Sequence, residues 1–391
     1  MFVFSGDPLR PGHVGPEFAG EPGAVRTAGA GHAVVDHAAL LAGDAAGAVA
    51  RVPRGSGAAW YRGRALPSER YAALAAALGE RGVPLLTSPE SYRAAHESPG
   101  RYGTFAGLRL DRRRASRAPG AVAPAGVRVW WVDGEPVLVG ARPDAPGRCP
   151  QPDLSAVAPV VRKALRTLGC RFVTTDLALR TDGMWRVVEV GDGQVGGLPA
   201  GAGTGELIEM LATVAAGFPP VLRAGRVVLR PVVPTAAARL ADGTGDGGAR
   251  PGEAVWAGGG PPESAATCAG AVAQAAASGL YRPGWGLFTI VRADDGTAVG
   301  SICFHGPPDD EGTVEIGYAL CPPARGAGWA TEATRLLADW AAGRPEVRTV
   351  LALTEPANVP SRRVLERAGF VPSGDRYGLR AHVFAGTGSF L

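Results

Sequence analysis

The chain has 391 residues, of which 46% are hydrophobic, so it is long enough to form two globular domains. Its net charge of +4 is too small to indicate nucleic acid or a membrane surface as a partner. The five cysteines show no CxxC spacing, which excludes a disulfide framework and a structural zinc site. No signal-like segment opens the chain and no apolar run reaches membrane-spanning length. We therefore expect a cytoplasmic protein.

The first hundred residues alternate short apolar runs with alanine-rich stretches. The runs "MFVF", "HAVVD" and "VPLLTS" predict strands, and "SERYAALAAALGERG" predicts a helix that Ser68 could cap. This order predicts a small α/β layer. The arginine-rich stretch 109–126 is predicted to be a solvated linker or surface loop. The alternative, a basic patch for nucleic acid, lacks interleaved aromatic residues.

Two hairpins are predicted next, each with an Asp-Gly turn, at Asp133-Gly134 and at Asp182-Gly183. If the second turn has two residues, Asp176 lies opposite Glu189 with the Cβ atoms about 5 Å apart. Two carboxylates at that distance repel unless a cation or a proton lies between them. Mg²⁺ is a natural occupant, because it prefers carboxylate oxygens. Alternatively, both side chains face solvent, or a longer turn shifts the register by one residue.

Three segments of this half resemble ATP-grasp domain proteins of bacteria: "PRGSGAAWYRGRALPSERYAALAAAL", "RVWWVDGEPVLVG" and "FVTTDLALRTDGMWRVVEVGDGQVGGLP". Proteins of that fold bind ATP and Mg²⁺ to activate a carboxylate for ligation. The resemblance implies that Asp176, Glu189 and Asp192 are metal ligands. It also implies that Asp192 and Gln194 lie near the phosphates and that Arg128 contacts the γ-phosphate.

The chain departs from that pattern between "YGTFAGL" and "VRVWW", where such proteins carry a lid subdomain with lysines that hold ATP. About twenty residues, rich in Arg, Ala and Pro and without lysine, occupy the gap here. We therefore predict that residues 1–218, ending with a helix over 205–218, form a truncated ATP-grasp-like unit with a vestigial Mg/ATP site. An ATP- and Mg-dependent carboxylate-amine ligase is the alternative.

The second half begins with the predicted strand "RVVLRPV", followed by alanine-rich helical stretches as far as Gly279. "WGLFTIVR" and "TAVGSICFHG" predict a hairpin through Asp295-Gly296. The strand "TVEIGYAL" comes next, and its alternation gives a core face and an open face of smaller residues. The core face holds Val314, Ile316, Tyr318 and Leu320, and the open face holds Glu315, Gly317 and Ala319.

The stretch "CPPARGAGWATEA", residues 321–333, connects this strand to a predicted helix. The first N–H groups of a helix lack internal partners and carry the positive end of its dipole, so an anion binds there readily. Gly326, Gly328 and Ala330 keep side chains away from an approaching pyrophosphate, and Arg325 adds a charged donor. The sequence therefore predicts a phosphate cradle at this turn.

The R-x-x-G-x-A arrangement after "EIGYAL", followed by "LTEPANVPSRRVLERAGF", resembles the GNAT acetyltransferases over residues 222–385. The resemblance is greatest to their ribosomal-protein-alanine acetyltransferase branch, and it implies a mixed, splayed sheet that grips acetyl-CoA. In this family pattern Asn358 contacts the pantetheine arm; alternatively it only caps the next helix. The residues implied to bind acetyl-CoA are Ala319, Leu320, Cys321, Arg325, Gly326, Ala327, Gly328, Trp329, Ala330 and Asn358.

Acyl transfer to an amine needs a base, because only the neutral amine attacks a thioester. Glu315, on the open face, is the candidate base, and Ser361 is the candidate acid by the resemblance, since Leu365 stands at the family's tyrosine position. His305 is predicted to be structural. Cys303 and Cys321 are predicted to be small buried hydrophobic residues.

Together these observations predict a two-domain α/β (α+β) protein with a truncated ATP-grasp-like unit and a GNAT domain. We expect an N-acetyltransferase that transfers acetyl from acetyl-CoA to a primary amine by direct attack. The acceptor is a protein or peptide N-terminus or a small amine, with neither nucleic acid nor membrane as partner. A non-catalytic binding module is a further alternative, and the acceptor and oligomeric state stay open.

Overall fold

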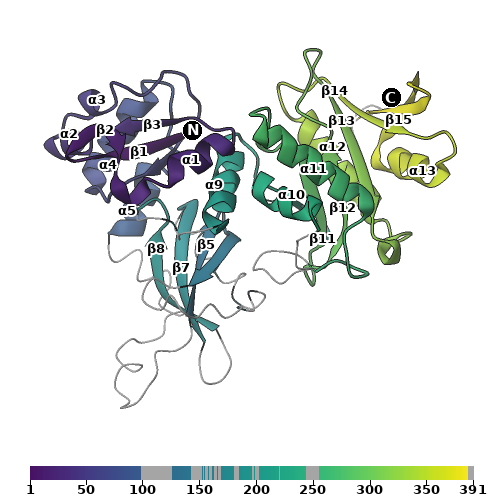
Figure 1. The fold of residues 1–391 in the computed structure, drawn as a ribbon, viewed down its shortest axis with the longest axis horizontal. Helices are drawn as coiled ribbons and strands as arrows, with labels where there is room; N and C mark the ends of the chain where they lie inside the picture. The colour runs from purple at the N-terminus through teal and green to yellow at the C-terminus, as the bar shows by residue number, and fades with distance from the viewer. Residues whose placement is uncertain are drawn as a thin grey trace. The chain divides into compact units, whose positions relative to one another are not determined.

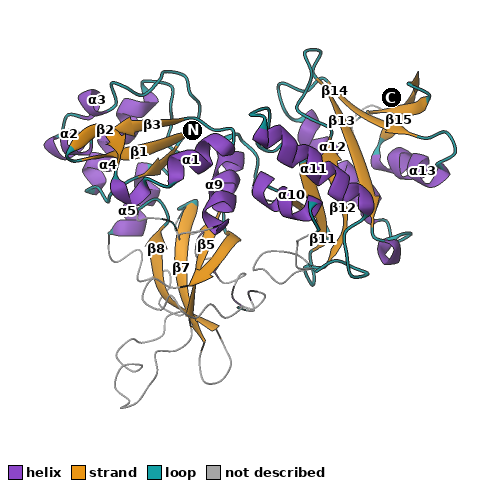
Figure 2. Ribbon diagram, viewed as in Figure 1, coloured by secondary structure: helices purple, strands orange, loops and turns teal. Residues whose placement is uncertain are grey.

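The computed structural model describes residues 1–97, 126–141, 171–179, 185–195, 202–219, 221–243 and 255–385, with single positions at 198 and between 152 and 170. The chain divides into two compact units, Met1–Gly217 and Phe218–Leu391, purple to teal and green to yellow in Figure 1. Both units combine helices with sheets, which confirms the predicted α/β class (Figure 2). The predicted linker as far as residue 125 and the Asp182-Gly183 turn lie outside the described residues.

The first sheet of the N-terminal unit is built on β1 (Phe2–Asp7), which pairs in parallel with β3 (His32–Val35) and β4 (Trp60–Arg62). β2 (Arg10–Val14) pairs with β1 in the antiparallel sense. The helices of this part are α1 (Glu21–Thr27), α2 (His37–Ala42), α3 (Ala45–Ala48), α4 (Ser68–Gly79) and α5 (Pro89–His96).

Two local predictions in this part are wrong. Pro67, not Ser68, is the N-cap of α4, and no side chain caps that helix. The run "VPLLTS" forms only an isolated bridge between Leu85 and Ala59. It lies beside the first sheet at that one point and is too short in its pairing to be a strand.

The second sheet is antiparallel, in the order β6-β5-β7-β8. Its strands are β5 (Gly126–Val132), β6 (Glu135–Ala141), β7 (Phe172–Leu179) and β8 (Trp185–Asp192). Asp133 and Gly134 have φ values of 51° and 80°, as the two central residues of a type I′ hairpin require. The first predicted hairpin is therefore confirmed. Helix α9 (Ala202–Ala215) follows the second sheet, three residues earlier than predicted.

The predicted pairing of Asp176 with Glu189 is also confirmed. Nearer the turn, however, Leu177 pairs with Val187, so those strand ends are offset by one residue from the predicted register. A β-bulge between Asp176 and Leu177 absorbs the difference. The two carboxylates thus face each other because of a bulge that the sequence pattern did not reveal.

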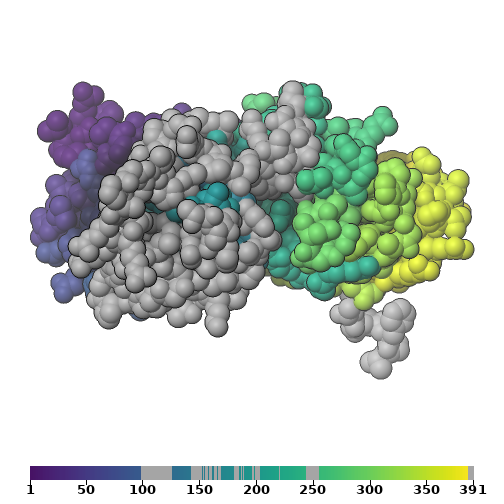
Figure 3. Space-filling view, turned by 90° about the horizontal axis from the view of Figure 1, so that it is seen from below, coloured from purple at the N-terminus to yellow at the C-terminus, as the bar shows by residue number. Residues whose placement is uncertain are grey.

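The C-terminal unit contains one eight-stranded sheet in the order β15-β16-β14-β13-β12-β11-β10-β9. The strands are β9 (Leu222–Ala224), β10 (Val227–Pro231), β11 (Leu287–Arg292), β12 (Ala298–Phe304), β13 (Thr313–Leu320), β14 (Thr349–Thr354), β15 (Phe370–Arg376) and β16 (Leu379–Phe384). Its helices are α10 (Pro234–Ala241), α11 (Glu263–Ala277), α12 (Trp329–Ala342) and α13 (Val359–Ala368). Figure 3 shows this unit in space-filling form, from green at its start to yellow at its end.

Helices cover both faces of this sheet. On one face Leu337 of α12 and Leu365 of α13 share a core with Ile302 of β12. On the other face Val272 of α11 packs with Cys303, the next residue of β12. Adjacent residues of one strand thus point into different cores, as the two-residue period of a strand requires.

Strand β13 has a different kind of partner on each side. It pairs antiparallel with β12 over 316–320 but parallel with β14 only over 313–315. Beyond Glu315 the ladder between β13 and β14 ends, which confirms the predicted mixed, splayed sheet. Among the described helices, none has the combination of length and apolar character needed to cross a membrane.

A buried ion pair stabilises the N-terminal unit. The Arg62 guanidinium, fully buried, donates from Nη2 to Glu21 Oε1 at 2.6 Å and from Nε to Oε2 at 2.8 Å. We expect Glu21→Gln to lower the free energy of unfolding of this unit by about 3 kcal/mol, because one partner of a buried pair is lost. Urea-dependent hydrogen exchange of peptides from β1 and β4 measures the change.

The matched control is Glu17→Gln, which removes the same charge from a partly exposed pair with Arg64 at 2.6 Å. Water screens that pair, so we expect a loss below about 1 kcal/mol. Equal losses for the two variants would contradict the assignment of a stabilising role to the buried pair.

Candidate active site

The turn before α12 is held open by two glycines. Gly326 and Gly328 have φ values of 78° and 86°, in the left-handed region that favours glycine. No heavy atom lies within 4 Å of the position that a Cβ would take at Gly326, and at Gly328 the nearest is Arg226 Nη2 at 3.1 Å. A ligand can therefore approach the backbone of this turn.

The N–H groups of residues 326–331 have no hydrogen-bond acceptor in the described part of the chain. On either side the bonding resumes: Arg325 N–H donates to Pro322 O at 3.3 Å, and Glu332 N–H donates to Gly328 O at 3.2 Å. Gly328 is the N-cap of the 14-residue helix α12, and no side chain caps it. Free donors at the positive end of a helix dipole suit an anion such as a pyrophosphate.

Arginine side chains surround this turn. Arg226 lies 4.1 Å from the ring centre of Trp329, donates from Nε to Glu332 Oε1 at 2.8 Å, and also bonds Ala327 O. The Nε of Arg325 reaches back to Leu320 O at 3.4 Å. Arg226 was not among the predicted site residues, because a single arginine before a strand carries no local signal. Its place beside the cradle arises from the pairing of β10 with the rest of the sheet.

Strand β13 turns some of its N–H groups toward the gap left by β14. His305 N–H donates to Glu315 O at 2.9 Å, and Cys321 N–H donates to Val299 O at 3.0 Å. Because bonding alternates along an antiparallel strand, the odd-numbered residues of β13 bond with β12. The N–H groups of Tyr318 and Leu320 therefore face the gap. Of the three predicted carbonyl-polarising positions, 319–321, only Leu320 turns its N–H there.

A pair of hydroxyl groups spans the gap between β13 and α13. Tyr318 Oη lies 2.9 Å from Ser361 Oγ, and burial raises the pKa of Tyr318. Asn358 accepts a hydrogen bond from Ser361 N–H at 3.1 Å, so its helix-capping role is confirmed. Leu365 is buried in the core, away from this pair. The sequence analysis placed Tyr318 only on the core face and so missed its hydroxyl group.

The predicted base is paired with a histidine. His305 Nδ1 lies 3.0 Å from Glu315 Oε1, and this hydrogen bond raises the pKa of His305. His305 Nε2 stands over Gly317, where an added Cβ would lie only 2.8 Å from it. The structure thus joins Glu315 to a residue predicted to be structural. The absence of a side chain at Gly317 makes room for the imidazole.

Two cysteines lie beside this pair. Cys268 Sγ of α11 is 3.2 Å from Cys303 Sγ of β12, and neither forms a disulfide. The hydrogen bond from Cys303 and the nearby His305 lower the pKa of Cys268. Cys303 and Cys321 are buried, as predicted.

In the N-terminal unit an arginine accompanies the predicted metal ligands. Arg128 lies opposite Asp176 on β5 and donates from Nε to Oδ1 at 2.7 Å and from Nη2 to Oδ2 at 2.9 Å. A guanidinium is thus the cation beside the paired carboxylates of Asp176 and Glu189. Arg128, predicted to contact the γ-phosphate, is itself engaged in this bidentate bond.

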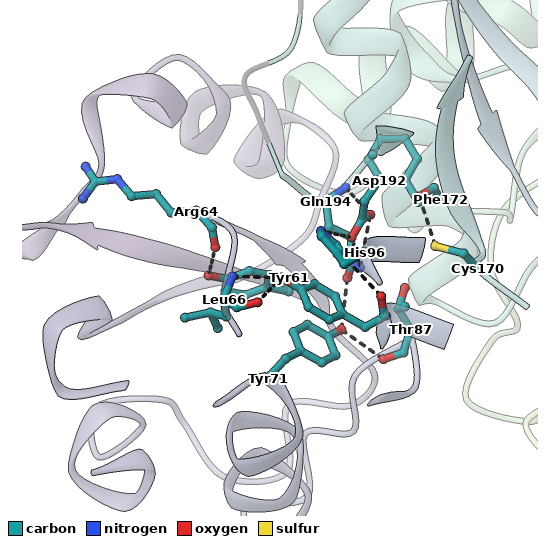
Figure 4. Close-up of polar contacts among 12 residues, drawn as sticks. Tyr61, Arg64, Leu66, Tyr71, Thr87, His96, Cys170, Phe172, Asp192 and Gln194 are labelled. Carbon is teal, nitrogen blue, oxygen red and sulfur yellow. Dashed lines mark hydrogen bonds and ion pairs between the residues drawn. The ribbon is translucent and has the colours of Figure 1, made fainter. Parts of the chain in front are cut away.

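Asp192 and Gln194 belong to a buried network (Figure 4). Asp192 Oδ1 accepts the Gln194 N–H at 2.8 Å, and Gln194 Oε1 accepts the Tyr71 hydroxyl at 3.2 Å. His96 Nε2 lies 3.7 Å from Asp192 Oδ2, and burial raises the pKa of that carboxyl. These contacts knit α4, α5 and β8 together.

The described residues contain no group of three His, Cys, Asp or Glu side chains that could hold a metal ion. Asp176 is occupied by Arg128, and Asp192 by Gln194. The described side chains therefore do not fit a Mg²⁺ ion, and no chemical step is derived through Mg or ATP. The assignment of Asp176, Glu189 and Asp192 as metal ligands stays a prediction.

Residues 226–371 match the family model of the acetyltransferase (GNAT) domain, and residues 91–211 match that of an ATP-grasp domain, clade family 3. The chain therefore joins an ATP-grasp domain to a GNAT domain. Both predicted resemblances are confirmed. The cradle, the splay and the hydroxyl pair all lie in the GNAT domain.

The GNAT domain is similar to two curated proteins of Bacillus subtilis (strain 168). The uncharacterized N-acetyltransferase YjdG is 36% identical over 88 residues, which are 22% of this chain and 52% of YjdG. The uncharacterized N-acetyltransferase YnaD is 28% identical over 87 residues, 22% of this chain and 51% of YnaD. The chain thus spans about half the length of the curated relatives that it matches.

Solved structures are also similar in part. An acetyltransferase from Agrobacterium tumefaciens str. C58 is 24% identical, with 42% of this chain and 94% of that chain covered and a TM-score of 0.30. A GNAT-family acetyltransferase from Bacillus anthracis is 20% identical, with 42% and 95% covered and a TM-score of 0.29. Scores this low carry no argument about the chemistry of this chain.

The cysteine pair yields a prediction. Because the pKa of Cys268 is lowered, its alkylation by iodoacetamide should reach half its maximal rate at a pH below about 8.5, the ordinary thiol value. Cys303→Ala removes the hydrogen bond and should move this midpoint to higher pH, whereas Cys303→Ser keeps a donor and should move it less. Peptide mass spectrometry after timed alkylation measures the rate, and identical midpoints in all three proteins would contradict the contact.

Proposed function

We propose that this protein is an acetyl-CoA-dependent N-acetyltransferase that acts on a primary amine through its GNAT domain. The observation that carries the proposal is the row of free N–H groups at residues 326–331, at the start of α12 and beside the gap between β13 and β14. Backbone donors in this arrangement suit a pyrophosphate at the turn and an acyl-pantetheine arm in the gap.

Acetyl-CoA would be held at two places. Its pyrophosphate would accept hydrogen bonds from the turn Arg325 to Ala330, with the Arg325 guanidinium as an added charge. Its thioester carbonyl would accept the N–H groups of Tyr318 and Leu320, which face the gap. Donors aimed at the carbonyl oxygen stabilise the negative charge that develops there during acyl transfer.

The transfer would be direct. The neutral amine nitrogen forms a bond to the carbonyl carbon while the carbon–sulfur bond breaks, and the departing thiolate receives a proton. The hydroxyl pair of Tyr318 and Ser361, 2.9 Å apart, would supply that proton and be restored from solvent. The products are the N-substituted acetamide and free coenzyme A, with one proton released per ammonium group consumed.

The cradle is tested by Gly326→Asp. A carboxylate at this open turn should repel the pyrophosphate and weaken acetyl-CoA binding by tenfold or more, equivalent to at least about 1.4 kcal/mol. Gly378→Asp is a matched control, because Gly378 has a φ of 79°, equal within one degree to that of Gly326, and likewise no heavy atom within 4 Å of its Cβ position. Isothermal titration calorimetry measures both affinities. Wild type that fails to bind acetyl-CoA, or equal binding by the two variants, would contradict the proposal.

The hydroxyl pair is tested by Tyr318→Phe. This change should lower kcat by about 10²-fold and leave the affinity for acetyl-CoA unchanged, because only proton donation is lost. Tyr377→Phe, at a side chain that is 95% exposed, is the control. Thiol release is followed with a chromogenic reagent; acetyl-CoA binding with no thiol release from any amine would instead indicate a binding module.

A further inference from the structure

A cavity of about 210 Å³ opens on the α11 side of the GNAT sheet. α11 lies across β11 and β12 in Figure 1, and the cavity lies between α11, the segment 280–286 and the end of β12. Most of its wall is apolar, formed by Ala271, Val272, Ala275, Leu280, Tyr281 and Trp285. The cavity is therefore shaped for an apolar group.

His305 connects this cavity to the gap between β13 and β14. It lines the cavity, and its Nε2 stands over Gly317. Gly317 lies two residues beyond Glu315, the last residue of β13 that pairs with β14. A molecule in the cavity would thus meet the acyl group at His305.

We propose that this cavity holds the apolar substituent of the acceptor amine, and that His305 Nε2, positioned by Glu315, takes the proton from the amine nitrogen. The proposal rests on the acetyltransferase function proposed above and adds the acceptor class and the base. Glu315, predicted as the base, becomes a positioning residue.

The hydrogen bond between His305 and Glu315 supports these roles. With Nδ1 donating to Glu315 at 3.0 Å, the neutral imidazole presents Nε2 as its acceptor. Nε2 takes one proton from the ammonium group, and the freed lone pair forms the carbon–nitrogen bond. The second proton lost by nitrogen balances the one delivered to sulfur.

The cavity also selects against a second charge. A charged group buried without a partner costs several kcal/mol of binding free energy, and the apolar wall of this cavity supplies none. The described titratable groups that face or adjoin His305 are Glu315 from β13, Cys303 from β12, Cys268 from α11, and Tyr281 and Arg282 at the cavity wall. Glu315 is the only carboxylate among these.

The acceptor class is tested with pentylamine and 1,4-diaminobutane, which have the same number of heavy atoms and differ in one terminal group. With saturating acetyl-CoA, kcat/KM for pentylamine should exceed that for 1,4-diaminobutane by tenfold or more. Ala275→Asp, which places a carboxylate in the apolar wall, should narrow or reverse this ratio. Equal values for the two amines in wild type, or a preference for the diamine, would overturn the acceptor class.

The base is tested by His305→Gln and Glu315→Gln, each assayed from pH 5.5 to 9. His305→Gln should lower kcat about 10²-fold, leave acetyl-CoA affinity unchanged and abolish the acidic limb of the pH profile. Because Glu315 raises the pKa of His305, Glu315→Gln should move that limb to lower pH while much of the activity remains. If Glu315 is the base instead, Glu315→Gln will abolish the limb and His305→Gln will cost less.

A double-mutant cycle tests the geometry. Gly317→Ala brings a Cβ against Nε2 and should lower kcat in wild type, yet have little further effect in His305→Gln. Additive losses would overturn the placement of Nε2. Calorimetric binding of acetyl-CoA separates the two proposals: wild type that fails to bind contradicts both, whereas normal binding with unchanged kcat in His305→Gln contradicts only the inference about the base.

Discussion

The chemistry of this protein depends on the point at which β13 loses its parallel partner. A strand inside a sheet satisfies its N–H and C=O groups on both sides, but β13 does so toward β14 only as far as Glu315. Beyond that point the N–H groups on one side of the strand face a gap. The free N–H groups at the start of α12 continue this row of donors. The backbone itself therefore forms the binding surface for the substrate.

The same strand divides the two proton-transfer roles between its faces. Side chains alternate along β13, so Tyr318 points toward α13 and Ser361, whereas Glu315 and Gly317 lie on the face toward His305. The proposed acid and base therefore lie on opposite sides of the acyl group. A direct transfer needs this separation, because the amine and the departing sulfur lie on different sides of the carbonyl carbon.

Arginine is the internal cation throughout the N-terminal unit. Arg62 pairs with Glu21, and Arg128 pairs with Asp176, in both cases through two guanidinium nitrogens. A planar guanidinium matches the two oxygens of a carboxylate and stays charged when buried, which a lysine would not do as reliably. Asp176 and Glu189 can thus face each other without the metal ion that their pairing suggested. In the ATP-grasp domain the described polar residues chiefly hold strands and helices together.

Local patterns accounted for much of this architecture. The residue pattern of β13 predicted its bounds, the Asp133-Gly134 pair predicted its hairpin, and the glycines at 326 and 328 predicted the open turn. Each of these depends on neighbours within a few residues, where backbone conformation and side-chain period are decided. The amino-acid order was therefore sufficient to place the cradle and to identify both domain families.

Packing between distant segments decided the rest. His305 meets Glu315 because β12 and β13 pair in one register, and Tyr318 meets Ser361, 43 residues away, because α13 packs beside the gap. The bulge after Asp176 and the position of Arg226 beside Trp329 likewise follow from strand pairing and burial. Such contacts depend on the register of whole strands and on the free energy of forming a common core, and no short pattern encodes either. The acid, the base and the acceptor cavity belong to this second kind.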